Sequence, residues 1–449
     1  MSSVPSASIV AGLSRDRDWA GLWRLALDLP LAEAVAAVAQ IERRWRPADE
    51  PGQELLSRLA AARPGQIRAA TAPPPSVQLS PRRRRQGFRC EFAPDGRAVA
   101  VEHRPSGLAP PVTYHELPSG RRKRGFRTFG KTVAVFDGGM VFAATGSYPV
   151  TPWFRYLPGR GSEMLGQVRQ QTLGNRAASV KGGFLIAEPA RLLYGTAEPA
   201  SPLRDVTPPA LQLDGDRDVF HDVVADPLTG RLAVHIIRRS TVLRDDVLIL
   251  GQDFSVAGQI TIPFDERWRA VSALGFCQPN LFITLHGIYS DRQLRSWAIG
   301  QPAVTEAETE LKEVPYAIQT LPYAGLIKTG HSYLNAKTLG PAACPLALTW
   351  AQRSPGRHGT SATLSRDGGY AAFSQSRATT VEGAKVRDAL LLVRDLVQQE
   401  LSEWAARPMA GFSADDLAAV TVLHERTRGR PSERSAALLR DCLEYRTAR

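Results

Sequence analysis

The side chains best suited to acid–base or metal chemistry are scattered through this chain. Its eight histidines show neither H-E-x-x-H nor a comparable ligand spacing. His221 beside Asp222 is the pair we select as a catalytic candidate, because a catalytic imidazole needs an orienting acceptor. Four widely separated cysteines form no C-x-x-C pair, which indicates buried free thiols rather than a zinc site or a disulfide framework. The sequence therefore predicts no catalytic residue, no bound metal and no cofactor.

Three short segments partly match known binding or catalytic motifs. Asp214–Asp218 carries carboxylates at alternate positions, as a calcium loop does, but Val219 and Ala225 stand where an EF-hand needs Gly and Glu. Residues 159–166 are glycine-rich, yet no helix follows to hold a phosphate. Residues 330–334 lack the final glycine of a nucleophile elbow. We interpret all three segments as turns or polar loops.

Arginine supplies most of the positive charge. The chain has a formal net charge of +12, with 49 Arg against only 7 Lys. This skew is typical of a coding bias, although a site for a polyanion stays open as an alternative. Two runs are dense in basic residues. Residues 121–124 lead into an expected outer strand, where charge discourages edge-to-edge association, whereas residues 82–85 are four consecutive arginines in a loop.

A repeated hairpin pattern indicates how these side chains are positioned. Phe92-Ala-Pro-Asp-Gly-Arg-Ala-Val-Ala-Val101 is matched by Leu364-Ser-Arg-Asp-Gly-Gly-Tyr-Ala-Ala-Phe373, and each couples a turn to an alternating apolar strand. Weaker copies place turns near residues 95, 137, 182, 228, 279, 323 and 367, which lie 42 to 51 residues apart. A repeat of about 40 to 50 residues with four short strands is typical of a β-propeller blade. The sequence predicts a mainly β protein with a seven-bladed propeller.

The individual strands can be assigned in several units. In the first unit we expect strands at 87–92, 97–103, 112–117 and 124–129, and in the fourth at 231–237, 246–250 and 256–262. The seventh unit lacks an outer strand, because the segment after its strand at 389–393 has helical periodicity. The alternating segment 76–80 lies just before unit one. We predict that it pairs with 389–393 and closes the ring, which would protect two exposed strand edges.

The Ala-Pro-Asp-Gly-Arg and Ser-Arg-Asp-Gly-Gly turns resemble the Ser-Pro-Asp-Gly turn of WD40-like propellers over roughly residues 87–395. The Trp-Asp pair that usually ends the third strand is absent, since Tyr114-His-Glu-Leu-Pro118 stands in its place. The resemblance implies a degenerate WD40-like propeller.

Helical segments flank the repeats. Apolar residues recur at helical spacing from Trp19 to Leu27, after Pro30 and after Pro51, and again from Val397, from the capping box at Ser413 and after Ser432. These stripes predict helices that pack on the propeller or on each other. The expected boundaries are helices in 1–63, an extended linker and the ring-closing strand in 64–86, the propeller in 87–395, and helices in 396–449.

This order of elements, with the Arg- and Ala-rich composition, resembles actinobacterial propeller proteins encoded beside MoxR-type ATPases and von Willebrand A proteins. The resemblance implies an assembly component rather than an enzyme. No apolar stretch reaches the roughly 18 to 20 residues of a membrane helix, and the N-terminus has no signal-peptide pattern. We expect a cytoplasmic protein with no membrane partner.

One face of the propeller is a candidate for partner binding. Loops that join one blade to the next share a face with those between the second and third strands of a blade. We therefore place these basic residues together on that face: Arg82, Arg83, Arg84, Arg85, Arg238, Arg239, Lys385 and Arg387. The hypothesis is a protein-interaction scaffold with an acidic protein partner. The alternatives are a propeller hydrolase or lyase that uses the central funnel and, less favoured, nucleic-acid binding through the basic loops.

Overall fold

The computed structural model describes most of the chain, and all structural statements below concern those residues. They are 4–79, 83–84, 87–104, 111–123, 128–144, 150–169, 177–211, 213–214, 217–226, 228–239, 243–264, 268–277, 279–287, 292–299, 305–311, 318–329, 332–344, 363–365, 368–381 and 384–448.

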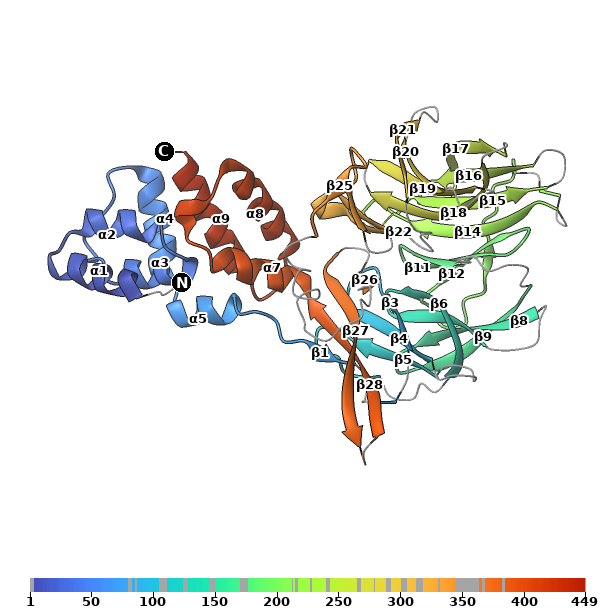
Figure 1. The fold of residues 1–449 in the computed structure, drawn as a ribbon, viewed down its shortest axis with the longest axis horizontal. Helices are drawn as coiled ribbons and strands as arrows, with labels where there is room; N and C mark the ends of the chain where they lie inside the picture. The colour runs from blue at the N-terminus through green and yellow to red at the C-terminus, as the bar shows by residue number, and fades with distance from the viewer. Residues whose placement is uncertain are drawn as a thin grey trace. The chain divides into compact units, whose positions relative to one another are not determined.

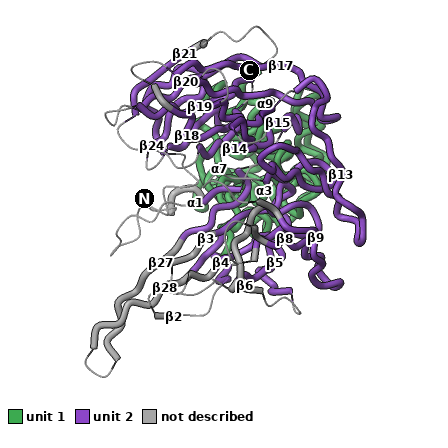
Figure 2. The backbone as a smooth tube through the Cα atoms, turned by 90° about the vertical axis from the view of Figure 1, so that its right-hand side faces the viewer, with its two compact units in different colours: residues 1–75, 394–449 green, residues 76–393 purple. Residues whose placement is uncertain are grey.

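The chain divides into two compact units (Figure 2). One unit combines both ends of the chain, residues 1–75 and 394–449, and is helical. The other unit, residues 76–393, contains the strands and is a seven-bladed β-propeller (Figure 1). The predicted fold class, a mainly β seven-bladed propeller with helices at both chain ends, is confirmed.

Every blade is an antiparallel sheet, and in blades 1 to 6 the strands follow one another in sequence order. Blades 1 to 3 comprise β3 (Gly87–Phe92), β4 (Ala98–Arg104) and β5 (Pro111–Glu116); β6 (Thr128–Phe136), β7 (Gly139–Ala144), β8 (Val150–Leu157) and β9 (Gly161–Arg169); and β10 (Ala177–Val180), β11 (Gly183–Ala187), β12 (Leu192–Thr196) and β13 (Arg204–Asp205).

Blades 4 to 6 comprise β14 (Val219–Ala225), β15 (Leu232–Arg238), β16 (Arg244–Leu250) and β17 (Val256–Pro263); β18 (Trp268–Cys277), β19 (Asn280–Gly287), β20 (Arg292–Ala298) and β21 (Thr305–Glu310); and β22 (Ile318–Leu321), β23 (Leu326–Thr329), β24 (Ser332–Asn335) and β25 (Pro341–Ala342), with a short 3-10 helix, η1 (Pro322–Ala324), between β22 and β23. The strands expected in the fourth unit match β15, β16 and β17 to within two residues at each end.

Strand β6 belongs to two blades. Its first residues, Thr128 and Phe129, pair with Val112 and Pro111 of β5, and the rest of β6 pairs with β7. Blades 1 and 2 are therefore one continuous seven-stranded sheet. The outer strand expected at 124–129 is present at its last two residues, while 124–127 lie outside the described residues.

The seventh blade takes its outer strand from the N-terminal side, as predicted. It contains β26 (Thr363–Leu364), β27 (Tyr370–Val381) and β28 (Ala384–Asp395), and β28 pairs with β1 (Val77–Gln78). Val77 lies opposite Val393 and Gln78 opposite Leu392, and the Leu79 amide donates to the Leu391 carbonyl at 3.0 Å. A second short strand, β2 (Arg83–Arg84), pairs further along β28.

Apolar side chains join neighbouring blades. Each hydrophobic cluster of the propeller draws its residues mainly from two successive blades, and one of them joins blade 7 to blade 1. Aromatic pairs mark some of these contacts: the ring centroids of Phe136 and Phe184 lie 5.2 Å apart, and those of Tyr114 and Tyr156 lie 5.8 Å apart. The ring is held by burial between blades, which is the main favourable term in folding.

The helical unit contains α1 (Val4–Arg15), α2 (Trp19–Ala26), α3 (Leu31–Val38), α4 (Glu50–Ala61) and α5 (Pro64–Ala70), and then α7 (Leu396–Ala405), η2 (Met409–Gly411), α8 (Ala414–Arg426) and α9 (Glu433–Thr447). The predicted capping box at Ser413 and Asp416 is present. The extended linker expected from Pro64 onward is wrong over its first residues. Pro64 begins α5, since proline fits the first turn of a helix, where its missing N–H is not needed.

The two chain ends fold against each other. One hydrophobic core contains buried residues of both, including Trp23 and Tyr445, whose rings lie 5.8 Å apart. Polar contacts also join the two chain ends: the Tyr445 hydroxyl donates to Asp49 at 3.0 Å, and Arg58 pairs with Asp441 at 2.6 Å. The expected packing of the helices on each other is confirmed.

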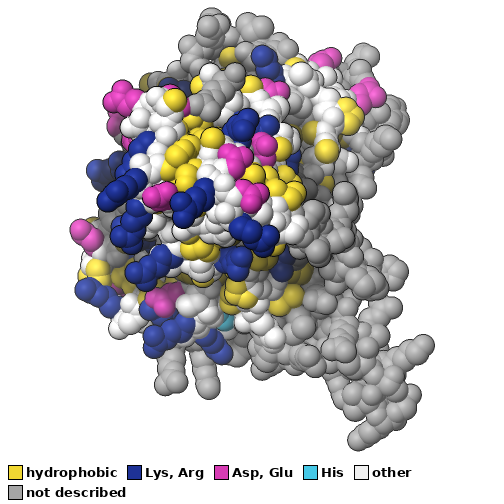
Figure 3. Space-filling model, turned by 90° about the vertical axis from the view of Figure 1, so that its left-hand side faces the viewer, with side chains coloured by type: hydrophobic (Ala, Val, Ile, Leu, Met, Phe, Trp, Pro, Cys, Tyr) yellow, Lys and Arg dark blue, Asp and Glu magenta, His cyan; other side chains and the backbone are white. Residues whose placement is uncertain are grey.

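Basic and acidic side chains are interspersed with apolar ones on the face drawn in Figure 3. None of the described helices is long and apolar enough to cross a membrane.

Candidate functional site

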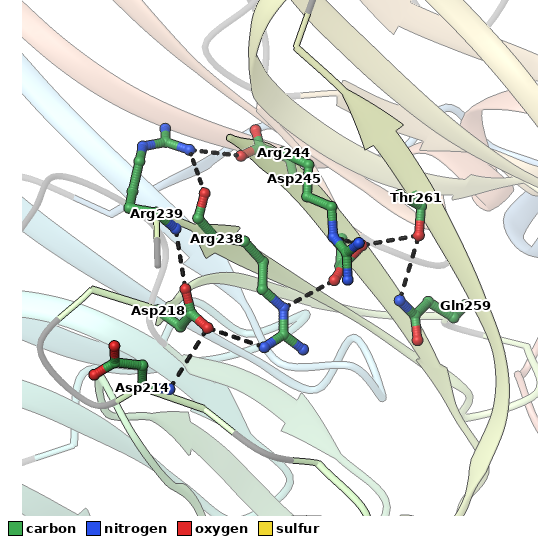
Figure 4. A network of polar contacts seen from close by, with 9 residues as sticks. Asp214, Asp218, Arg238, Arg239, Arg244, Asp245, Gln259 and Thr261 are labelled. Carbon is green, nitrogen blue, oxygen red and sulfur yellow. Dashed lines mark hydrogen bonds and ion pairs between the residues drawn. The ribbon is translucent and has the colours of Figure 1, made fainter. Parts of the chain in front are cut away.

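The densest polar cluster in the described residues lies in blade 4 (Figure 4). The turn between β15 and β16 presents Arg238 and Arg239 on one side, and β16 begins with Arg244, Asp245 and Asp246. The antiparallel register sets Ile237 opposite Asp245 and Arg238 opposite Arg244. This hairpin brings three guanidinium groups and two carboxylates to one end of the blade, where Asp218 adds a third carboxylate just before β14.

Arg238 is the centre of this blade 4 cluster. Its Nε donates to Asp246 Oδ2 at 2.9 Å and its Nη1 to Asp218 Oδ2 at 3.1 Å. The Arg238 side chain is only 15% exposed, and both carboxylates are buried. A buried charge is tolerated when it is paired and hydrogen-bonded, so Arg238 is engaged inside the blade rather than displayed to solvent.

The other two arginines surround the pair. The Arg239 amide donates to Asp218 Oδ1 at 3.0 Å, and its guanidinium lies 4.5 Å from the centre of the Phe264 ring, a cation–π distance. Arg244 Nε lies 3.4 Å from Asp246 Oδ1, which also accepts from the Thr261 hydroxyl at 2.9 Å. Side chains from β16, β17 and both flanking loops are thus held in one network.

A histidine–carboxylate pair lies next to this network. His235 Nε2 and Asp245 Oδ2 are 3.1 Å apart, and the two side chains are 1% and 0% exposed. Asp245 Oδ2 also accepts from the Val271 amide of blade 5 at 2.8 Å. Because neither side chain reaches solvent, no substrate can touch the imidazole while the blade is closed. The pair connects blades 4 and 5 and is a structural contact.

His221 and Asp222, the pair singled out in the sequence, are arranged differently from His235 and Asp245. The His221 ring packs edge-on against His235, with centroids 5.1 Å apart. Asp222, its neighbour in sequence, is buried and accepts from the Val223 amide at 2.8 Å. Asp245 is the carboxylate that lies against His235, and sequence reasoning missed it. Its signal was available: two adjacent aspartates open an otherwise apolar strand, six residues after two adjacent arginines.

Four of the remaining predicted basic residues, Arg83, Arg84, Lys385 and Arg387, fall on the seventh blade. Strand β2 pairs with β28 so that Arg83 lies opposite Ala389 and Arg84 opposite Asp388. Lys385 and Arg387 belong to the same strand β28. The backbone thus brings these two groups of basic residues together, and we call residues 83–84 with 385–389 the basic edge. Arg82 and Arg85 lie outside the described residues, and blades 5 and 6 separate Arg238 and Arg239 from the basic edge in the order of the ring.

Other candidate motifs have structural roles in the described residues. Residues 159 and 161 are glycines with positive φ in the β8–β9 turn, as expected. Asp218, the last carboxylate of the calcium-like segment, is held by the two arginines. No group of three or more His, Cys, Asp or Glu side chains in the described residues is placed to hold a metal. Burial raises the pKa of the free thiols Cys90 and Cys442 to about 12 and that of Cys277 to about 11.

No family model matches this sequence, and no curated protein matches it. Among solved structures, the chain is similar to the Dos1 propeller, with 11% identity over 71% of this chain and 82% of that one and a TM-score of 0.41. A chain of the mitotic checkpoint complex has 12% identity over 71% of this chain and 94% of that one, with a TM-score of 0.38. A prolyl endopeptidase has 12% identity over 69% of this chain and a TM-score of 0.39, and the match spans only 47% of that enzyme's chain.

At 11–12% identity and TM-scores below 0.5, these matches say nothing about the function of this chain. The class defined by the sheet topology is a seven-bladed β-propeller in a chain that also has a helical unit built from both chain ends.

Proposed function

We propose that this protein is a protein-interaction scaffold whose propeller docks an acidic segment of a partner protein at the basic edge. The observation that carries the proposal is the pairing of β2 with β28, which sets Arg83 and Arg84 beside the strand that contains Lys385 and Arg387. Two basic segments 300 residues apart in sequence thereby form one edge. Basic residues gathered in this way favour fast encounter with an acidic partner.

The distribution of charge supports an acidic partner. The helical unit has 18 Arg and no Lys against 17 Asp and Glu, so it is nearly neutral. The propeller has 38 Lys and Arg against 27 Asp and Glu, and therefore carries +11 of the formal charge of +12. A surface potential of this sign acts over about 8 to 10 Å at physiological salt, so association at the basic edge weakens as salt rises.

The kind of assembly follows from the sequence resemblance. The chain resembles actinobacterial propeller proteins that are encoded beside MoxR-type ATPases and von Willebrand A proteins. These two protein classes are therefore the first candidates for the partner. On this proposal the chain is a cytoplasmic, non-catalytic component of such an assembly, and the helical unit provides a second surface for its other members.

Charge reversal at the basic edge tests the proposal. We compare tagged wild-type protein with the double variant Arg83→Glu, Arg84→Glu in affinity purification from the source cells. The matched control is Arg121→Glu with Arg122→Glu, a tandem pair of exposed arginines in blade 1. The expected result is a protein that co-purifies with wild type and control, dissociates at high salt and is at least tenfold depleted with the Arg83/Arg84 variant.

Two results would overturn the proposal. One is equal recovery of the same proteins with all three baits, provided that their thermal melts agree. The other is an association that disappears after nuclease treatment, which would indicate that the basic edge binds nucleic acid. Phosphate contacts are also salt-sensitive, so the nuclease step and not the salt step separates these two classes of partner.

A further inference from the structure

A second surface lies on blades 4 and 5, away from the basic edge. A groove of about 180 Å³ opens between β17 of blade 4 and β20 of blade 5. Its lining includes Ile249, Ile260, Leu281 and Trp297, which belong to the hydrophobic cluster between the two blades. The groove is thus an opening into the apolar layer that joins the blades.

The volume limits what the groove can hold. Pockets that bind drug-sized molecules and cofactors measure about 300 to 1,000 Å³. A groove of about 180 Å³ instead accommodates one large apolar side chain. Its wall at Gly258 has no side chain, and this glycine pairs with Ile249 in the adjacent strand. The opening therefore depends on a missing side chain in a strand, where glycine is otherwise unfavourable.

One charged residue lines the groove. The guanidinium of Arg231 has no hydrogen bond or ion pair with any described residue, in contrast to Arg238 and Arg239 in the same blade. The turn just before it exposes Leu228, and Val256 is exposed at the start of β17; each is 46% exposed. A positive charge that has no partner among the described residues, beside an apolar groove and exposed apolar side chains, is complementary to an acidic and apolar segment.

The strand beside the groove offers backbone groups as well. Strand β17 is the last in the order β14-β15-β16-β17, so its outer edge has no partner strand among the described residues. An exposed edge presents unpaired N–H and C=O groups to an extended chain. The arginine and the strand edge both belong to blade 4, which forms one wall of the groove.

We propose that this groove binds an extended segment of a partner protein that inserts one aromatic or large aliphatic side chain between blades 4 and 5 and sets an acidic residue against Arg231. This site is separate from the basic edge, and the proposal does not depend on the function proposed for that edge. The apolar side chain is the anchor, since a buried aromatic side chain provides most of the affinity in such contacts. The acidic residue fixes the direction in which the segment lies.

Short peptides test the groove in the full-length protein. The probes are fluorescein-labelled Gly-Ser-Glu-Phe-Glu-Ser-Gly, the same peptide with Lys for both Glu, and the same peptide with Ala for Phe, each titrated by fluorescence anisotropy. We expect saturable binding of the first peptide and at least tenfold weaker binding of the other two. A tenfold change corresponds to about 1.4 kcal/mol.

Two variants and a control locate the site. Gly258→Val fills the groove, and it should leave the fold intact because an added Cβ lies 4.0 Å from Ile249, an ordinary contact. It should weaken binding of the Glu peptide at least tenfold. Arg231→Glu should invert the preference between the Glu and Lys peptides. Arg217→Glu, which makes the same charge change at an exposed position of blade 4, should leave both affinities unchanged.

If Gly258→Val lowers the melting temperature, the Arg231→Glu variant still tests the proposal, because its preference between the Glu and Lys peptides should be inverted. The proposal is wrong if wild type binds none of the peptides up to about 1 mM, which corresponds to about 4 kcal/mol of binding free energy. It is also wrong if the Glu and Lys peptides bind equally well, or if Arg217→Glu alters the preference as much as Arg231→Glu does.

Discussion

The closing strand provides the sharpest test of how the propeller is held together. Leu79 follows β1 and is 5% exposed, in the apolar cluster that joins blade 7 to blade 1. Leu79→Ala removes three buried carbons, worth about 0.8 kcal/mol each, and leaves a cavity that adds to the loss. The amide that donates to Leu391 is retained. We therefore expect the closed ring to lose about 2 to 4 kcal/mol.

Hydrogen exchange measures this loss where it occurs. A chain of two units is not expected to unfold in a single two-state step, so a global melt would mix their contributions. Exchange of the amides of residues 391–393 reports local opening of the seventh blade. A loss of about 2 to 4 kcal/mol should reduce their protection by roughly 30- to 900-fold, at about 1.36 kcal/mol per factor of ten. Amides of α9 in the helical unit should exchange at unchanged rates.

The control is the neighbouring residue. Gln78 is the exposed member of β1, so Gln78→Ala should change stability by less than about 0.5 kcal/mol. If Leu79→Ala and Gln78→Ala leave the protection of residues 391–393 equally unchanged, burial of the Leu79 side chain does not hold the ring closed. The cohesion of the ring would then have to come from the backbone pairing of β1 with β28 and from the other apolar contacts between blades.

Three further outcomes are expected. Arg238→Ala should lower the free energy of unfolding by about 3 to 5 kcal/mol, because it removes the arginine that pairs with two buried carboxylates. Arg191→Ala, at an exposed ion pair, should lower it by at most about 1 kcal/mol. Denaturant unfolding monitored by hydrogen exchange compares the two variants. Burial lowers the pKa of His115, so its contribution to stability is full above the unfolded-state pKa of about 6.5 and is lost as the pH falls below it. His115→Gln should flatten the pH dependence of the blade 1 melt between about pH 7 and pH 5, and an unchanged slope would contradict the assignment. Gly183→Ala should destabilise blade 3, since its Cβ would collide with the backbone carbonyl of the opposite strand. Gly12→Ala, with open space around it, should stabilise α1 by about 0.5 to 1 kcal/mol. Equal melting temperatures for these two variants would refute the steric argument.

The ring and its closure could be predicted because both depend on local patterns. Turn residues repeat at a nearly constant spacing, and alternation marks the strands between them. Residues 76–80 alternate and precede the first blade, while the seventh unit ends in a helical pattern, so one missing strand and one spare strand point to each other. The prediction required no knowledge of side-chain contacts.

The joining of the two chain ends could not be predicted in the same way. Apolar stripes show that a helix buries one face, but not which surface covers it. Trp23 and Tyr445 are more than 400 residues apart, and only the closed ring brings the segments that carry them together. The helix at Pro64 was missed for a different reason, since proline is compatible both with an extended connector and with the first turn of a helix.

The blade 4 cluster shows where reading charge from sequence fails. The sequence places Arg238 and Arg239 on the docking face because the loop between the second and third strands of a blade shares a face with the loops between blades. The carboxylates that pair with them stand on either side in sequence, at 218 and at 245–246, and they meet the arginines only when the hairpin register is known. The same residue types that indicate a docking surface can therefore build an internal contact.

The charge of the propeller has a cause that its arginine content does not reveal. Lys and Arg make up 18 of 131 residues in the helical unit and 38 of 318 in the propeller, a slightly lower share in the propeller. What differs is the number of acidic residues, which is 17 in the shorter unit and only 27 in the longer one. A coding bias toward arginine accounts for a similar basic content in both units, but not for the scarcity of acids in one of them. Acids buried in internal pairs neutralise the arginines that they contact, so the excess positive charge is carried by the other basic side chains of the propeller. Any acidic molecule is drawn toward such a surface whichever loop it meets. Attraction alone therefore identifies no docking site, and only charge reversals matched in number and exposure can separate the basic edge from the rest of the ring.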